Sequence, residues 1–137
     1  MKQFFLCLLF SMMLAVNSAH SQSLQPSVDD FIEAIKAEVA SPQPFFQFAK
    51  LVDPFDLHRS TVETVRDILR KQYRNKDATF DVIYRNRDSE HAETIIGALW
   101  ADKSYSFMAF VLHKRPDGWL PISYSLQSDY QKIMKYR

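Results

Sequence analysis

The sequence predicts an α+β fold in which N-terminal helices pack on a curved four-stranded antiparallel meander sheet. Three observations carry this prediction. Apolar residues recur at helical spacing in the first half of the chain, and they alternate with polar residues at strand spacing from Ala78 to Gln127. Two tight turn signals and one looser turn divide that second stretch into four strands. Because strands joined by short turns pair antiparallel, the four should form a meander.

The first 21 residues have the features of a secretory signal peptide. Lys2 gives a basic start, an apolar run extends from Phe4 to Val16, and small residues precede the expected cleavage after Ser21. Cleavage after Ser18 is the alternative, and a retained N-terminal anchor is another. The run is shorter than the roughly 20 residues of a membrane-spanning helix, so we expect no stable span. The predicted mature protein, residues 22–137, is a single domain exported to the periplasm or the extracellular space.

Composition excludes several classes of function. Cys7 is the only cysteine and lies in the signal segment, so the mature protein should have no disulfide and no cysteine-based metal site. Loss of Lys2 leaves 16 of the 17 basic residues to balance 16 acidic ones. A balanced charge gives no electrostatic basis for binding nucleic acid. The chain has two glycines, too few for a phosphate-binding loop. We expect no cofactor and no metal.

The first half of the chain predicts three helices. Ser27 can cap a helix over 27–40 whose apolar residues fall on one face. Two prolines end that helix, and the phenylalanines of 45–52 predict a short helix in the core. Ser60 to Glu63 is a capping-box sequence and predicts the start of a third helix. The buried stripe of this third helix should be Val62, Val65, Ile68, Leu69 and Tyr73.

Turn signals predict the strand boundaries. A polar stretch from Asn86 to Glu90 is the looser turn, and Asp102-Lys103 is short enough for a two-residue hairpin. Arg115-Pro116-Asp117-Gly118 is a strong turn sequence, because proline and glycine favour its dihedral angles. Pro121 has no N–H to donate to a ladder, so the last strand should lie at an edge of the sheet. The strands should span 80–85, 91–101, 104–114 and 119–127.

Turn lengths also predict the register between strands. Across the Asp102-Lys103 hairpin, Trp100 should pair with Tyr105 and Ile96 with Ala109. A slip by one residue would move a whole set of side chains to the opposite face, so the register decides which residues lie together. Across the next turn the predicted pairs are His113 with Leu120, Val111 with Ile122, Ala109 with Tyr124 and Phe107 with Leu126.

The register sorts the side chains of the sheet onto two faces, here named after one residue of each. The Ala98 face has small residues at its centre and aromatic residues around them. The Ile95 face is too apolar to be simply solvated, so either the Phe-rich helix or a second subunit should cover it. The Ala98 face comprises Thr94, Ala98, Trp100, Tyr105, Phe107, Ala109, His113 and Tyr124, and a homodimer would form through Ile95, Leu99, Met108, Phe110 and Leu112.

This order of elements resembles the cone-shaped fold of the nuclear-transport-factor-like (cystatin-like) superfamily. The resemblance covers roughly Ser27 to Gln127, and Asp117-Gly118-Trp119 is its one local sequence feature. It implies a pocket between the helices and the concave face of the sheet, which we place on the Ala98 face. Close packing of a helix against that face is the alternative to a pocket. The residues expected to bind a small apolar ligand are Trp100, Tyr105, Phe107, His113 and Tyr124.

No motif specifies a reaction, so three classes of function stay open. The leading hypothesis is an exported noncatalytic binding module for a small apolar ligand or a protein partner. The second is a small isomerase or hydratase in which a desolvated His113 is the general base and Tyr124 or Tyr105 donates a hydrogen bond. The third is an inhibitor or immunity-type protein that acts through a surface such as Phe45 to Phe48 or the face of Phe110.

Overall fold

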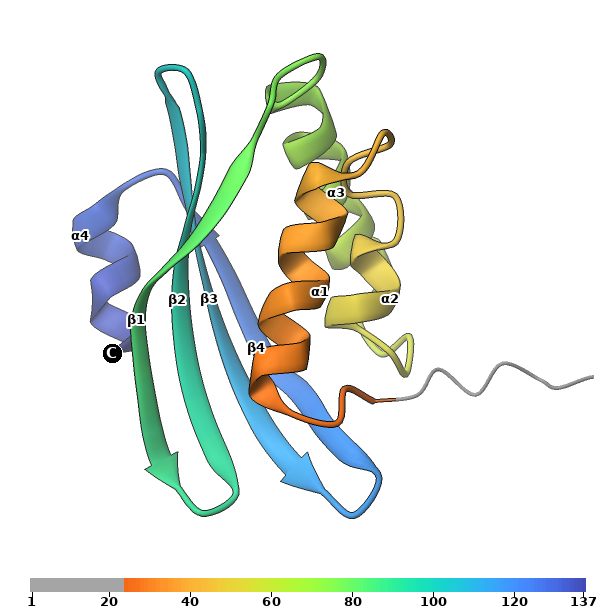
Figure 1. Cartoon of the computed structure of the whole chain (residues 1–137), viewed down its shortest axis with the longest axis vertical. Helices are drawn as coiled ribbons and strands as arrows, with labels where there is room; N and C mark the ends of the chain where they lie inside the picture. The colour runs from red at the N-terminus through yellow and green to blue at the C-terminus, as the bar shows by residue number, and fades with distance from the viewer. Residues whose placement is uncertain (1–23) are drawn as a thin grey trace, which may run out of the picture.

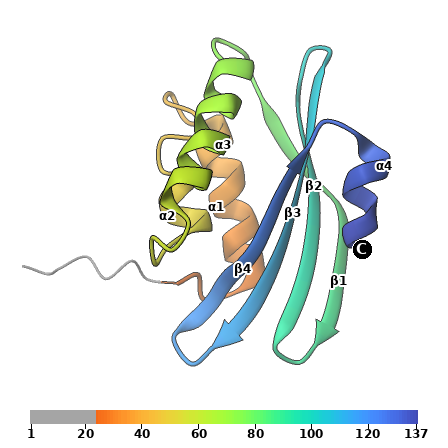
Figure 2. The same ribbon diagram turned by 180° about the vertical axis from the view of Figure 1, so that it is seen from behind.

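The fold is α+β, as predicted, with a helical layer against one face of a four-stranded antiparallel sheet (Figure 1). The computed structural model describes residues 24–137, so the predicted signal peptide, with cleavage after Ser21 or Ser18, lies outside the described residues. The strands follow one another in the order β1-β2-β3-β4, which confirms the meander. Figure 2 shows a short C-terminal helix on the side of the sheet away from the helical layer.

The first two helices form where the sequence predicts them. α1 (Val28–Ala40) is capped by Ser27, whose side chain accepts a hydrogen bond from the backbone N–H of Asp30. α2 (Phe48–Val52) lies in the Phe-rich stretch. Phe45 and Phe48 are 0% and 1% exposed, because both point into the core, whereas Phe46, which lies between them in the sequence, is 54% exposed. The Phe-rich stretch is therefore mainly a packing element.

α3 (Arg59–Gln72) begins earlier than predicted. The prediction of a capping box that begins at Ser60 is wrong, because His58 is the N-cap. The side chain of His58 forms no capping hydrogen bond with any described residue. The carboxylate of Asp53 instead accepts hydrogen bonds from the backbone N–H groups of Leu57 and His58, at 2.9 and 2.8 Å. The prediction for Ile68 is also wrong, since this residue is 49% exposed. The buried residues of α3 are Val62 and Leu69, followed by Tyr73 at the C-cap.

The first strand is longer than predicted, whereas the second begins one residue later than predicted. β1 spans Thr79–Ser89, β2 Ala92–Ala101, β3 Ser104–Arg115 and β4 Gly118–Gln127. β1 continues through the polar stretch that predicts a loose turn, and only Glu90 and His91 lie between β1 and β2. The β2–β3 register is confirmed, including the pairs Trp100–Tyr105 and Ile96–Ala109.

A β-bulge in β4 makes the second part of the predicted register wrong. His113 pairs with Leu120 as predicted, but the pairing then shifts and leaves Ile122 as an extra residue after Pro121. The proline has no N–H for the ladder, which favours an irregularity beside it. The following side chains of β4 change face. Tyr124 therefore lies on the Ile95 face and not on the Ala98 face.

A second bulge lies in β1, next to the glycine of β2. Val82 pairs with Gly97 and Tyr84 with Ile96, so Ile83 is the extra residue. The ring of Phe80 covers Gly97 so closely that a Cβ at position 97 would lie 2.1 Å from it. The glycine thus provides the space that a buried aromatic ring needs.

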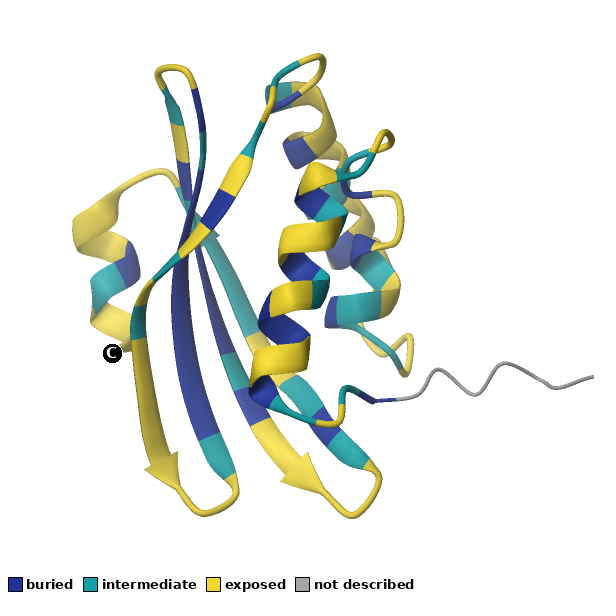
Figure 3. Cartoon of the chain, in the orientation of Figure 1, coloured by how far each residue is buried: buried dark blue, intermediate teal, exposed yellow. Residues whose placement is uncertain are grey.

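The helical layer covers the Ile95 face, which agrees with the expectation that the Phe-rich helix covers that face and corrects the expectation of a pocket between the helices and the Ala98 face. Phe31 of α1 packs edge-on against Phe110 of β3, with ring centroids 5.1 Å apart. In Figure 3, β2 is buried over most of its length between this layer and the C-terminal helix. The prediction of a homodimer through the Ile95 face is therefore wrong, because helices of the same chain cover that face. Its proposed contacts Ile95, Leu99, Met108, Phe110 and Leu112 are at most 2% exposed.

The centre of the Ala98 face is covered by the C-terminal segment. α4 (Tyr130–Ile133) leads into the 3-10 turn η1 (Met134–Tyr136). Ile133 is fully buried in a cluster with Ile96 and Ala109. Close packing of a helix is thus found over these residues, although the helix is C-terminal. Asp129 caps α4 by accepting a hydrogen bond from the Gln131 backbone N–H at 2.7 Å.

Two polar contacts join the helical layer to the sheet. The hydroxyl of Tyr73 donates to a β2 carbonyl at 2.9 Å and lies 3.1 Å from the hydroxyl of Ser106, while burial raises the pKa of Tyr73. Arg85 of β1 binds the buried carboxylate of Glu93 and also binds Asp29, in the first turn of α1, at 2.5 Å. These contacts fix the relative position of the two layers.

Candidate functional site

The structure separates the five residues predicted to bind a ligand. Trp100, Tyr105 and Phe107 form a row on the Ala98 face, with ring centroids 6.3 and 6.4 Å apart. His113 is exposed at the other end of β3, roughly 26 Å from Tyr105 at about 3.3 Å per residue. Tyr124 lies on the opposite face of the sheet. Three pockets among residues 24–137 are described below, and none of the five residues lines any of them.

The aromatic row is explained by packing within the chain. The rings of Trp100 and Tyr105 stack at an interplanar angle of 19°, and those of Tyr105 and Phe107 at 21°. Phe107 also contacts Tyr130 of α4 edge-on, at 5.6 Å between centroids. Such cross-strand and neighbouring aromatic contacts stabilise a sheet. The row therefore supports the β2–β3 hairpin and the docking of α4.

The structure bears on the residues named for the two alternative functions. The isomerase or hydratase hypothesis needs a desolvated His113 beside Tyr105 or Tyr124, whereas the structure exposes the histidine and places both tyrosines elsewhere. The inhibitor hypothesis names a surface such as Phe45 to Phe48 or the face of Phe110; Phe45, Phe48 and Phe110 are buried, and Phe46 is exposed. Residues 24–137 contain no group of three His, Cys, Asp or Glu side chains that could hold a metal ion. None of the helices in this range is long and apolar enough to cross a membrane.

One candidate site is a pocket of about 300 Å³ between the N-terminal segment, α1, α2 and β4. It is named the Trp119 pocket here. Trp119 and Leu24, each 7% exposed, form much of its apolar surface. Glu38 and Lys50 are its two charged residues. The complete lining is Leu24, Gln25, Ala34, Glu38, Gln47, Lys50, Leu51, Pro54, Trp119 and Pro121.

The N-terminal segment closes one side of the Trp119 pocket by pairing with β4. The backbone N–H of Trp119 donates to the carbonyl of Gln25 at 2.8 Å. Gly118 permits this approach, because a Cβ there would lie 2.8 Å from the same carbonyl oxygen. Its φ of 134° is also in the range that side chains disfavour. The pairing of β4 with the N-terminal segment thus explains the sequence Asp117-Gly118-Trp119.

Glu38 is the titratable group of the Trp119 pocket with a perturbed pKa. Burial raises the pKa of its carboxyl group, although hydrogen bonds from the backbone N–H groups of Gln47 and Phe48 act in the opposite direction. The bond from Gln47, at 2.7 Å, ties α1 to the start of α2. Perturbed carboxyl groups in clefts are common at functional sites, but they also occur in structural networks. Here the carboxylate has both a structural partner and access to the pocket.

A third and smaller pocket, of about 260 Å³, lies between α2 and the first half of α3. Its charged side chains mostly have partners: Asp53 accepts from the backbone N–H groups of Leu57 and His58 in the α2–α3 loop, and Asp56 binds Arg59 at 2.7 Å. Nearby polar groups include the Nε of Arg66, which is buried without a hydrogen-bond partner among the described residues. With its charges largely satisfied, this pocket gives no specific ligand chemistry.

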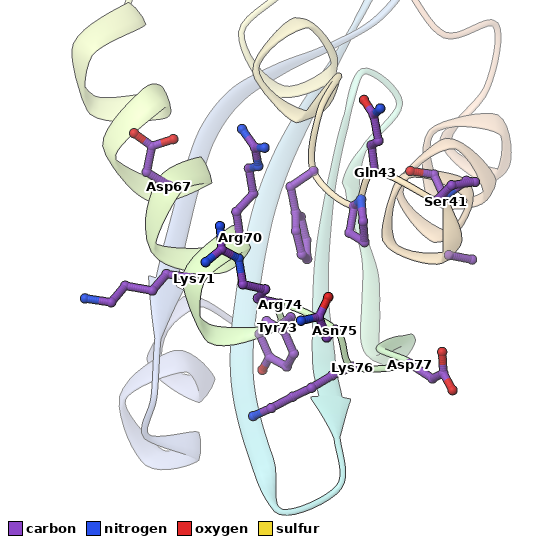
Figure 4. Close-up of a pocket in the computed structure, with 14 residues that line it drawn as sticks. Ser41, Gln43, Asp67, Arg70, Lys71, Tyr73, Arg74, Asn75, Lys76 and Asp77 are labelled. Carbon is purple, nitrogen blue, oxygen red and sulfur yellow. The ribbon is translucent and has the colours of Figure 1, made fainter.

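The largest of the three pockets is an open cleft of about 970 Å³ between the α1–α2 loop and the C-terminal half of α3. It is named the arginine cleft. Figure 4 shows Arg70 rising between α3 and the loop that carries Ser41 and Gln43, with Lys71 pointing away. Its complete lining is Ala40, Ser41, Pro42, Gln43, Pro44, Phe45, Asp67, Arg70, Lys71, Tyr73, Arg74, Asn75, Lys76 and Asp77.

Sequence reasoning missed the Trp119 pocket and the arginine cleft because each is built from segments that are distant in sequence. The basic residues near the end of α3 can be read from the sequence, but nothing in the sequence places the α1–α2 loop opposite them. Comparisons of the chain with protein-family models, curated proteins and solved structures find no match. The resemblance to the nuclear-transport-factor-like superfamily stays a prediction.

Proposed function

We propose that this protein is an exported, noncatalytic binding module that holds a small, largely apolar molecule in the Trp119 pocket. The observation that carries the proposal is the combination of a mostly apolar wall with two charged groups, Glu38 and Lys50, at one pocket. Ligand sites typically combine an apolar lining with a few polar groups that orient the ligand. Export follows from the features of the first 21 residues.

The dimensions of the pocket suggest the kind of ligand. A volume of about 300 Å³ is at the lower end of the roughly 300–1,000 Å³ range of ligand pockets, so the molecule should be small. Its body would contact Leu24, Leu51 and Trp119, and a polar head would lie toward Glu38 or Lys50. Because Glu38 already accepts a backbone hydrogen bond, its role would be to orient the ligand and not to transfer a proton.

A matched pair of substitutions in α1 tests this proposal. Ala34 lines the pocket, whereas Ala37, in the same helix, is exposed outside it. Ala34→Leu should fill the pocket and weaken binding of the neutral fluorescent probe N-phenyl-1-naphthylamine at least tenfold. Ala37→Leu makes the same chemical change and should leave the affinity unchanged. Probe titration of residues 22–137 measures both, and thermal unfolding checks that each variant is folded.

Native mass spectrometry of the purified protein provides an independent test. The wild type should retain a small molecule that Ala34→Leu lacks. The Trp119 pocket is not the binding site if Ala34→Leu and Ala37→Leu bind the probe with equal affinity. The same conclusion follows if the wild type binds no probe and carries no small molecule after purification.

A further inference from the structure

The residues that line the arginine cleft are more basic than the chain as a whole. The whole chain has 17 basic and 16 acidic residues, yet the cleft brings together four basic and two acidic side chains. The lining residues therefore carry a formal net charge of +2, which counts Lys71 although its side chain points away from the cleft in Figure 4. Its charged residues are Arg70, Lys71, Arg74 and Lys76 on the basic side and Asp67 and Asp77 on the acidic side.

The cations in the last turn of α3 and just after it have no ion-pair partner among the described residues. Arg70, Lys71 and Arg74 form no ion pair with any residue of 24–137, whereas Lys76 donates to the hydroxyl of Ser104 at 3.0 Å. The dipole of α3 favours cations in its last turn, which accounts for part of the cluster. However, Arg70 lies in the last turn of α3 and Arg74 two residues past its end, so two like charges line the same cleft and repel one another. A bound anion would remove that repulsion.

The opposite wall of the cleft is rigid and carries neutral donors. Pro42 and Pro44 restrict the backbone of the α1–α2 loop, and Gln43 between them provides an amide group. Phe45 has a φ of 64°, an unfavourable value for a bulky side chain, and is held there by ring contacts to Phe48 and Tyr73 at 6.1 and 6.2 Å. Strained backbone of this kind clusters at functional sites.

We infer that the arginine cleft binds a small molecule through a dianionic phosphate group. A charge of −2 would neutralise the local charge of the cleft in one contact. The planar guanidinium groups of Arg70 and Arg74 can each present two N–H groups to phosphate oxygens, a geometry that favours arginine at phosphate sites. The amides of Gln43 and Asn75 can donate to the remaining oxygens. This site is separate from the Trp119 pocket, so either proposal can fail without the other.

The test uses inorganic pyrophosphate as the probe, titrated into ¹⁵N-labelled residues 22–137 at constant ionic strength. The largest NMR shift changes should occur at Arg70, Arg74 and the side-chain amides of Gln43 and Asn75. Arg70→Gln/Arg74→Gln should weaken binding at least tenfold. The control Arg87→Gln/Arg137→Gln removes the same charge from exposed positions outside the cleft and should have less than a twofold effect.

The source of the phosphate is distinguished by vesicle flotation. Binding to phosphatidylcholine vesicles that contain phosphatidic acid, with loss in the cleft variant, would assign the site to a lipid head group. Binding of pyrophosphate without vesicle association would assign it to a soluble phosphorylated molecule. The inference is overturned if pyrophosphate shifts no cleft signal, or if both double variants weaken binding equally.

Discussion

At the scale of single residues, Glu38 shows most clearly how opposing forces act on a partly buried polar side chain. Its carboxylate stabilises the start of α2 through the Gln47 backbone N–H, but partial burial removes it from water. Desolvation is the larger effect, so the pKa of Glu38 is raised. The folded protein therefore binds a proton at this site more tightly than the unfolded chain does.

This raised pKa predicts a pH dependence of stability. The stabilising contribution of protonated Glu38 should be fully present below the ordinary glutamate pKa of 4.5 and be lost as the pH rises through the folded-state pKa. Glu38→Gln keeps an oxygen that accepts from Gln47 but does not titrate. The wild type should thus lose stability relative to the variant above pH 4.5. Urea unfolding of both proteins at several pH values measures the difference, and a difference independent of pH would contradict the expectation.

At the scale of secondary structure, irregular positions in the strands decide, together with regular pairing, on which face of the sheet the side chains lie. Gly97 and the bulge at Ile83 lie beside each other in β2 and β1, where the ring of Phe80 crosses the glycine. The bulge at Ile122 follows a proline in β4. Both bulges exchange the faces on which later side chains lie, which is how Tyr84 and Tyr124 reach their positions.

Gly97→Ala should be destabilising, although alanine usually suits a strand better than glycine. The new Cβ would lie 2.1 Å from the Phe80 ring, which is itself buried, so the ring must move. Overpacking of this kind costs about 1–3 kcal/mol of the free energy of unfolding. Denaturant unfolding measures the cost. Combining Gly97→Ala with Phe80→Leu gives the control, since the two effects should be non-additive if the ring is the cause; additive losses would exclude it.

At the scale of the whole molecule, the sequence predicted the fold class and failed on how the layers meet. Helical periodicity located α1, and the Asp102-Lys103 turn set the β2–β3 register. However, periodicity does not show which face of a two-sided apolar sheet the helices cover. The bulge after Pro121 moved Tyr124, and the C-terminal helix took the space expected for a ligand. The sites depend on contacts between distant segments, which local patterns do not encode.

The attachment of the helical layer to the sheet provides a whole-molecule prediction. Arg85 links Asp29 of α1 to the buried Glu93, and both hydrogen bonds raise its pKa. Arg85→Ala should cost about 1.5–3 kcal/mol of the free energy of unfolding, because a buried carboxylate loses its charged partner. Arg87→Ala, two residues along the same strand, should change it by less than about 0.5 kcal/mol. Urea unfolding of both variants tests this, and equal losses would show that the link is not stabilising.

The bulges at Ile83 and Ile122 also bear on how the protein behaves at high concentration. An open sheet has two outer strands whose free backbone groups can template the addition of further strands and lead to fibrils. β1 is interrupted at Ile83 and then carries Arg85, Arg87 and Asp88, while β4 is interrupted at Ile122 beside Pro121. These features oppose strand addition at both outer strands. The same irregularities that misplace side chains in a simple register should therefore protect the protein from amyloid-like aggregation.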